Sequence, residues 1–540
     1  MNYITKKLNH SEISKISIIS TIAFFLFAHG YRFSNLLFSH DSLNICEYKP
    51  DWEIGIGRFI QPVLYVLRGV LGAPWLFSIM AMFWMILSVL LFLKIFKIDI
   101  LWMIVAVSGV MTCNNVITLS NATYIQWMDV YTLALFTAIL AAKLLTVEEN
   151  VSIKNIVLAA VLVTISMGLY QAYIGVTLGI IVFYYVLRLG EYDSEETIGS
   201  LFIGIVKACL SVLLGGILYL VSWKAILALT GINSQNYFGM DEGSSANGYF
   251  YALYRTYKNV AIFFRRPSLY NTGSAIGTNL IEAANVLANI FILMYIGILP
   301  IANYLKNSKK ACKINLLLQY VLLIFLPFAV NFACFMTKGD EHDLMRYGMV
   351  MIYVYVLAQI NIVSTKKIVV PQIILLVCIS VVVWTNIVFS NQLYLKKSLQ
   401  EEATNYKIGQ LIQMIEEVSE SANMKQPTKV IIAGNPGDNE YFSDIRGTDM
   451  LGGTGIFDSP ITYGRTIGFY MNYMLGANME VYLLDKDDNI YLVGDDETNW
   501  NPSNITNDEL LDMPVFPNDG AVYEYNNYII VKMSDTYMVY

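Results

Sequence analysis

Residues 368–402 read IVVPQIILLVCISVVVWTNIVFSNQLYLKKSLQEE, and the character of the chain changes within this stretch. Its first part is long and apolar enough to cross a bilayer, whereas lysines and glutamates appear soon after Asn391. Over the whole chain 56% of the residues are hydrophobic and only 14% are charged, which is typical of a membrane protein. The sequence therefore predicts a multi-span α-helical membrane domain over residues 1–390 and a soluble α/β domain over residues 391–540.

Eleven apolar stretches upstream of this boundary are candidate membrane spans, since a helix needs roughly 20 apolar residues to cross the hydrocarbon. They are 13–34, 74–96, 100–118, 124–145, 154–170, 173–189, 198–228, 277–304, 314–335, 347–364 and 368–389. The pair 154–170 and 173–189 requires a tight turn at Gln171–Ala172. The alternative is one long helix, which would invert everything downstream.

The distribution of lysine predicts the orientation. Lys6, Lys7 and Lys15 precede the first span, so the positive-inside rule favours a cytoplasmic N-terminus. Eleven spans keep the lysine-rich run 306–313 and the pair Lys366–Lys367 inside, whereas ten would export one of them. The loops 35–73, 231–276 and 336–346 and the C-terminal domain are then extracytoplasmic. No small-residue cleavage site follows the first span, so we expect that span to be retained.

Several classes of site have no support in the sequence. The six cysteines lack CxxC spacing, and only Cys46 falls in an outer loop, so neither a disulfide framework nor a zinc site is predicted. Common phosphate-binding, zinc-protease and nucleophile-elbow motifs are absent. The net charge of −7 argues against nucleic acid as a partner.

The first outer loop contains two candidate site residues. Asp41 follows the first span, where an ionised carboxylate is suited to act as a general base for an acceptor hydroxyl. The alternatives are a solvated acid or a helix cap at Asp41–Ser42. Arg58 precedes the amphipathic segment 59–67, for which we expect a helix lying in the interface. Its guanidinium is suited to bind either a substrate phosphate or lipid headgroups.

Other candidates lie near the outer ends of later spans. Asp129 is an ionisable residue within a span, and such residues usually face a cavity or form structural hydrogen bonds. Arg265 and Arg266 close the tyrosine-rich loop 231–276, whose aromatic and amide side chains suit a sugar but also fit any exposed loop. Arg346 precedes a span, where it is placed to bind an anionic headgroup or to act as a membrane anchor.

The C-terminal domain shows α/β patterning. A helix is predicted over 396–420, a strand over 429–433, a helix over 462–475 and strands near 479–484 and 490–493. Residues 521–533 are typical of a hairpin turning at Asn526–Asn527. Because no catalytic constellation is visible, we expect this domain to bind the acceptor or to brace the outer loops.

The order of these features resembles the bacterial Gtr-type glucosyltransferases of the GT-C superfamily, which use polyprenyl-phosphate-linked sugars. The likeness covers about residues 20–390 and rests on the segments SHDSL at 39–43, GRFIQP at 57–62, LRG at 67–69, PWL at 74–76 and YQAYIG at 170–175. It implies transfer of a sugar, typically glucose, on the outer face of the bacterial plasma membrane. Asp41 matches the position of the superfamily's essential carboxylate.

The resemblance also implies further roles. An inverting displacement by the acceptor would release polyprenyl phosphate (undecaprenyl phosphate in many bacteria), with stabilisation from Arg58, Arg265, Arg266 or Arg346. Gln61 and Gln171 lie inside the shared segments and are candidate substrate-binding residues together with Asp129. The superfamily includes metal-dependent and metal-independent members, and no cofactor is predicted. The expected acceptor is an exported glycan, a wall polysaccharide or teichoic acid in one envelope type and O-antigen in the other.

Three alternatives remain at this point. A transporter or flippase of lipid-linked saccharides would favour internal repeats, broken helices and charges at the midplane. A non-catalytic scaffold would make Asp41 and the arginines dispensable. A polysaccharide polymerase would use a longer lipid-linked donor.

Overall fold

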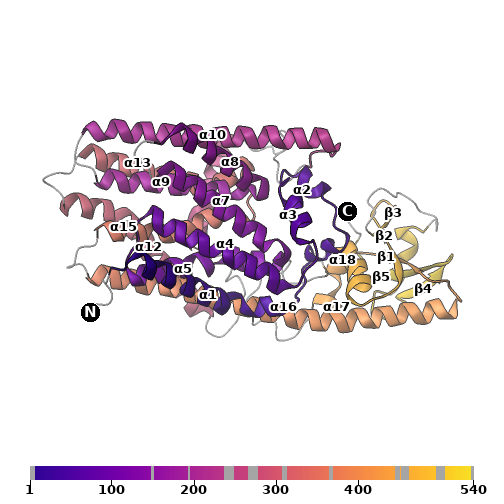
Figure 1. Cartoon of the computed structure of the whole chain (residues 1–540). Helices are drawn as coiled ribbons and strands as arrows, with labels where there is room; N and C mark the ends of the chain where they lie inside the picture. The colour runs from indigo at the N-terminus through magenta and orange to yellow at the C-terminus, as the bar shows by residue number, and fades with distance from the viewer. Residues whose placement is uncertain are drawn as a thin grey trace.

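The protein is a long helical bundle with a small α/β domain at one end, called here the domain end (Figure 1). The computed structural model describes residues 7–146, 151–191, 195–235, 248–265, 278–306, 313–363, 369–443, 451, 461, 463–493 and 505–536. The bundle consists of α1 (His10–Ser34), α4 (Pro74–Ile95), α5 (Leu101–Thr112), α6 (Asn115–Thr123), α7 (Met128–Thr146), α8 (Ile153–Leu169), α9 (Ile174–Glu191), α10 (Glu195–Thr230), α12 (Thr278–Lys306), α13 (Lys313–Val330), α15 (Tyr347–Val363) and α16 (Val369–Ser421).

Each of the eleven predicted spans coincides with a helix or with a helix broken once. Nine segments of the described chain are long and apolar enough to cross a membrane, which fits the predicted membrane protein. The helices α8 and α15 have 17 residues each and fall short of that length. The count of eleven spans, and with it the orientation of the termini, therefore stays a prediction.

The predicted turn near Gln171 is present. Tyr170 is extended (φ −159°, ψ 108°) and separates α8 from a short 3₁₀ turn, η3 (Gln171–Tyr173), that leads into α9. The side-chain Nε2 of Gln171 donates to the carbonyl of Ile56 at 2.6 Å, so this turn lies at the domain end, beside the first long loop. The alternative of one continuous helix is excluded.

One span is interrupted in its interior. The helices α5 and α6 separate at Cys113–Asn114, and the side chain of Asn114 satisfies backbone groups on both sides of the break. Its Oδ1 accepts from the backbone N–H of Ile117 at 3.0 Å, and its Nδ2 donates to the carbonyls of Val110 and Met111 at 3.1 and 3.0 Å. Such pairing is required because water is scarce at this depth.

The loop after α1 forms η1 (Ser42–Glu47), α2 (Asp51–Gly55) and α3 (Gln61–Arg68). In α3 the side chains of Gln61 and Tyr65 are buried, while Val63, Val66 and Leu67 are exposed. This distribution matches the amphipathic helix predicted over 59–67, with an apolar face available to a bilayer surface. The remaining loops of the domain end form α11 (Tyr249–Arg265), α14 (Phe332–Met336) and η5 (Asp343–Met345).

The C-terminal domain contains a five-stranded sheet in the order β3-β2-β1-β5-β4. Its strands are β1 (Thr428–Ala433), β2 (Met479–Leu484), β3 (Ile490–Leu492), β4 (Val522–Tyr525) and β5 (Tyr528–Lys532). The strands β2, β1 and β5 are parallel, and the two edge strands are antiparallel. The predicted hairpin is confirmed, and Asn526 and Asn527 turn it with φ values of 50° and 72°. The domain also contains α17 (Glu440–Ser443), α18 (Gly464–Phe469), the π-helical turn η7 (Tyr470–Met474) and the 3₁₀ turns η6 (Pro436–Asp438) and η8 (Asn507–Leu510).

The helix α16 joins the two parts. The sequence predicts a span over 368–389 and a separate helix over 396–420, but the structure has one helix of 53 residues, about 80 Å long at 1.5 Å per residue. It runs along the bundle and continues to the sheet (Figure 1). Ile408, Leu411 and Ile415 are fully buried against the domain core. The helix is therefore continuous across the predicted domain boundary at residue 390.

We expect Asn114→Ala to lower the free energy of unfolding by about 2 kcal/mol, since it removes a helix cap and the donor to two buried carbonyls. Thermal unfolding in detergent measures the change. The control is Asn115→Ala, because among the residues that the structure describes the Asn115 side chain bonds only the neighbouring backbone N–H of Val116. Equal unfolding temperatures for the two variants would contradict the bridging role of Asn114.

Candidate active site

The carboxylate of Asp41 lies at the domain end, between α1 and η1. The hydroxyl of Tyr124 donates to its Oδ2 at 2.6 Å, and Nε2 of His40 lies 3.1 Å from the same oxygen. Within the part of the chain that the structure describes, Oδ1 accepts no hydrogen bond. Although Asp41 precedes η1, its side chain caps no backbone N–H, so the helix-cap alternative is excluded.

The surroundings of Asp41 favour the charged carboxylate. Burial alone raises its pKa, but the hydrogen bond and charge of His40, the Tyr124 hydroxyl and the charge of Arg465 outweigh it. The net effect lowers the pKa of Asp41 below its ordinary value, so the group is ionised at neutral pH. An ionised carboxylate with one oxygen available for a proton meets the requirement for a general base.

The segment that carries Asp41 is tied to both parts of the protein. The backbone N–H of Phe38 donates to Oε2 of Glu401 at 3.0 Å, and Nζ of Lys397 donates to the carbonyl of Phe38 at 3.0 Å. On the other side, Oγ of Ser39 donates to the carbonyl of Thr123 at 2.8 Å. Asp41 is therefore held between α6 of the bundle and the extension of α16.

Arg58 lies in the short loop between α2 and α3. Its guanidinium lies 4.9 Å from the centre of the Tyr170 ring, and its backbone N–H donates to the carbonyl of Glu53 at 2.7 Å. The preceding Gly57 has φ 85°, and a Cβ there would collide with Tyr219, so glycine is required. The Arg58 residue is half-buried in this position.

Gln61 and Gln171 brace this loop. Nε2 of Gln61 donates to the carbonyl of Leu169 at 2.6 Å, as Gln171 does to Ile56. Both amides thus bind backbone carbonyls across the contact between the first loop and the α8–α9 turn. Their predicted role in substrate binding stays a prediction, and the structure shows them as anchors of the Arg58 loop.

The last loop of the bundle carries Arg346 between two carboxylates. Its Nε lies 3.1 Å from Oε1 of Glu341, and Nη1 pairs with Asp343. Glu341 is buried, which raises its pKa, although Arg346 and the amides of Asn259 and Asn331 oppose the shift. The Arg346 charge is therefore largely compensated inside the protein, and its predicted role at the donor phosphate stays a prediction.

His342 marks the place where these loops meet. Burial lowers the pKa of this histidine. The charges of Asp343 and Asp41 raise it, whereas the charges of Arg346 and Arg58 lower it further. The charges of Asp41, Arg58 and Arg346 thus all influence one half-buried histidine. The charge of Arg465, on the C-terminal domain, lowers the pKa of the Asp41 carboxyl.

The remaining candidates lie elsewhere. Asp129 forms a buried ion pair with Arg68, whose Nε lies 2.7 Å from Oδ2, and Arg68 also donates to the carbonyl of Gln126. Arg265 ends α11 and is exposed, and Arg266 lies outside the described residues. No group of three or more His, Cys, Asp or Glu side chains in the described ranges is arranged to hold a metal ion.

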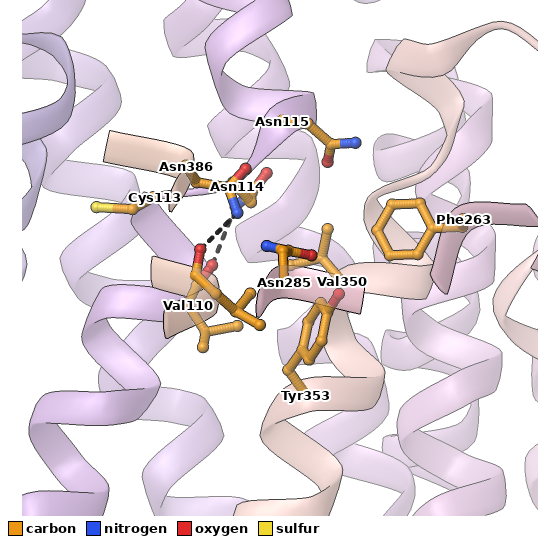
Figure 2. A pocket seen from close by; sticks show the side chains of 10 residues that line it. Val110, Cys113, Asn114, Asn115, Phe263, Asn285, Val350, Tyr353 and Asn386 are labelled. Carbon is orange, nitrogen blue, oxygen red and sulfur yellow. Dashed lines mark hydrogen bonds between the residues drawn. The ribbon is translucent and has the colours of Figure 1, made fainter. Parts of the chain in front are cut away.

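A second polar feature lies inside the bundle. A cavity of about 20 Å³ lies beside the α5–α6 break. Its lining includes Asn114, Asn115, Asn285, Asn386 and Tyr353, which Figure 2 shows as sticks. Oδ1 of Asn386 is buried and has no protein partner among the described contacts. The cavity has room for about one water molecule and no Asp, Glu, His, Lys or Arg lines it, so it does not suit a glycosyl transfer.

Sequence reasoning did not single out His40, Tyr124, His342 or Arg465. One signal was available: the chain has only four histidines, and two of them lie at this site. Tyr124 resembles any residue of an aromatic belt until its hydroxyl is seen on Asp41. Arg465 lies in the C-terminal domain, where the sequence shows no catalytic pattern.

Comparison with known families supports an enzyme. The family model described as glucosyl transferase GtrII matches residues 30–363, well over half of the chain. The chain belongs to this glucosyltransferase family. No curated protein and no solved structure matches. This match confirms the resemblance to Gtr-type glucosyltransferases that the sequence showed. The family supports glycosyl transfer as the activity, and it does not favour the transporter alternative. The matched region contains Asp41, Arg58 and Arg346 and ends before α16.

We expect Asp129→Ala to lower the free energy of unfolding by about 3–5 kcal/mol, because it leaves the buried Arg68 charge without a partner. The double variant Arg68→Met, Asp129→Leu should recover most of this loss. Unfolding temperatures in detergent report both changes. A stable Asp129→Ala protein without transferase activity would instead support the substrate-binding prediction.

Glu53 should make stability depend on pH. Burial raises its pKa to about 7, although a local backbone hydrogen bond and the Arg58 charge oppose the shift. A raised carboxyl pKa stabilises the fold fully below its unfolded value, and this stabilisation is lost as pH rises from about 4.5 to about 7. Glu53→Gln should therefore raise the unfolding temperature at pH 8 and not at pH 4.5. The exposed Glu402→Gln is the control, and parallel shifts at both pH values would refute the assignment.

Proposed function

We propose that the protein is a GT-C-type membrane glucosyltransferase that moves glucose from a polyprenyl-phosphate donor to an exported glycan. The observation that carries the proposal is the ionised Asp41, held with one oxygen available at the domain end, in a chain of the GtrII family. In this proposal the N-terminus is cytoplasmic, and the domain end faces the outside of a bacterial plasma membrane. The acceptor is a wall polysaccharide, a teichoic-acid-type polymer or O-antigen.

The proposed reaction is a single inverting displacement. Oδ1 of Asp41 accepts the proton of an acceptor hydroxyl while that oxygen attacks C1 of the glucose. The bond from C1 to the phosphate oxygen breaks on the opposite face, and its electron pair leaves with polyprenyl phosphate. The new glycosidic bond has the inverted anomeric configuration, and the proton remains on Asp41 until water removes it.

Arg58 is the proposed ligand of the departing phosphate. A guanidinium offers paired donors to phosphate oxygens and stabilises the charge that develops on them. Arg58 lies three residues before the start of α3, whose apolar face suits the bilayer surface where the lipid-linked phosphate must lie. Arg346 is the weaker candidate, because Glu341 and Asp343 already compensate its charge.

The decisive assay measures transfer from polyprenyl-phosphate-glucose in membranes that contain equal amounts of each variant. We expect Asp41→Asn to reduce turnover by about 10²–10⁴-fold, the usual contribution of a general base. The matched control is Asp51→Asn, an exposed acid of the same loop, which should keep wild-type activity. Full activity in Asp41→Asn would assign the base elsewhere, and no transfer by the wild type would remove the proposed donor.

A further inference from the structure

The C-terminal domain reaches the Asp41 carboxylate through α18. The ring of Tyr463 packs edge-on against His40, with ring centres 5.6 Å apart. Arg465 is two residues further along the chain, and its charge acts on Asp41. Phe38 and Leu43, on either side of Asp41 in the sequence, are buried in the hydrophobic core of the same domain. The soluble domain therefore packs against the segment that carries the candidate base.

The element that presents Tyr463 and Arg465 is packed into the domain, while the two side chains themselves are exposed. Thr466, Ile467 and Gly468 of α18 are buried against the sheet, and Oγ1 of Thr466 donates to the carbonyl of Tyr463 at 2.7 Å. Tyr463 is 41% exposed, and Arg465 is also exposed. Arg465 forms no hydrogen bond or ion pair with any residue that the structure describes. Neither side chain has an evident role in stabilising the domain.

The two substrates approach Asp41 from different directions. A lipid-linked donor comes from the bilayer, and the elements suited to it, Arg58 and α3, belong to the bundle. The exported glycan of the proposed function needs a polar surface beside Asp41, and the soluble domain supplies one at Tyr463 and Arg465. Because Tyr124 and His40 occupy Oδ2, the acceptor hydroxyl must reach Oδ1.

We propose that Tyr463 and Arg465 form the acceptor subsite beside Asp41, and that the acceptor carries a negative charge close to the accepting hydroxyl. A tyrosine ring offers a flat apolar face to the C–H groups of a sugar or polyol unit. A guanidinium binds phosphate or carboxylate oxygens in a planar, bidentate way. The acceptor class is then an anionic glycan or polyol-phosphate polymer, and the C-terminal domain selects it.

This inference rests on the proposed function, and the test separates the two. Envelope polymers of the host are divided by anion exchange into charged and neutral fractions, and each fraction is offered with polyprenyl-phosphate-glucose. We expect glucose to enter the charged fraction. Transfer only to the neutral fraction would overturn the inference and leave the proposed function intact, whereas transfer to neither fraction would overturn both.

Variants of Arg465 supply the second arm. Arg465→Ala should raise the KM for the charged acceptor about 10-fold or more, and Arg465→Lys should raise it less. The control is Lys486→Ala, on the exposed turn after β2, which should leave this KM unchanged. The KM for the donor and the rate of donor hydrolysis by water should stay at wild-type values in all variants. An unchanged acceptor KM in Arg465→Ala, or a raised donor KM, would refute the assignment, and the latter would place Arg465 at the donor phosphate.

Discussion

The two hydrogen bonds that α16 makes with the backbone of Phe38 set the geometry of the candidate site. Lys397 and Glu401 lie one helical turn apart and bind the carbonyl and the N–H of the same residue. A single helix therefore holds the loop that carries Asp41 and also supports the soluble sheet. Because α16 is continuous, Asp41 keeps a fixed position relative to both Tyr124 of the bundle and α18 of the domain. Without this clamp the loop would lose its hydrogen bonds to α16 and keep those that Ser39 and Asp41 make with the bundle.

Charged residues at the domain end fall into two groups with different physical roles. The pairs Arg68–Asp129 and Arg346–Glu341 are buried, and each charge compensates the other. Such pairs add little net stability over apolar replacements, but they are costly to break singly, so they fix the positions of the segments that carry them. The Asp41 side chain is only partly buried, and its Oδ1 accepts no hydrogen bond from the described residues. The compensated pairs therefore fix the segments that carry them, whereas Asp41 keeps one carboxylate oxygen exposed to a substrate.

The polar interior of the bundle has a structural explanation. Asn114 supplies the hydrogen bonds that the interrupted α5–α6 span lacks, and the nearby asparagines enclose the small cavity of Figure 2. A broken helix lined with amides is also what a transporter would show. Here the cavity has room for about one water and its lining holds no charged group, whereas the charges gather at the domain end. The arrangement fits chemistry at the surface of the bundle better than passage through it.

The sequence by itself determined the membrane class, the helices that coincide with the predicted spans, the amphipathic helix that ends at Arg68 and the Asn526–Asn527 hairpin. These features depend on local hydropathy and turn chemistry, which a linear pattern records. It also pointed to Asp41 and Arg58, through loop position and resemblance. Only the tertiary structure decided that α16 is one helix, that Asp129 belongs to Arg68, that Tyr124 binds Asp41 and that Arg465 acts on it from the other domain. The reason is that a hydrogen bond or ion pair depends on distance in space, and these partners lie far apart along the chain.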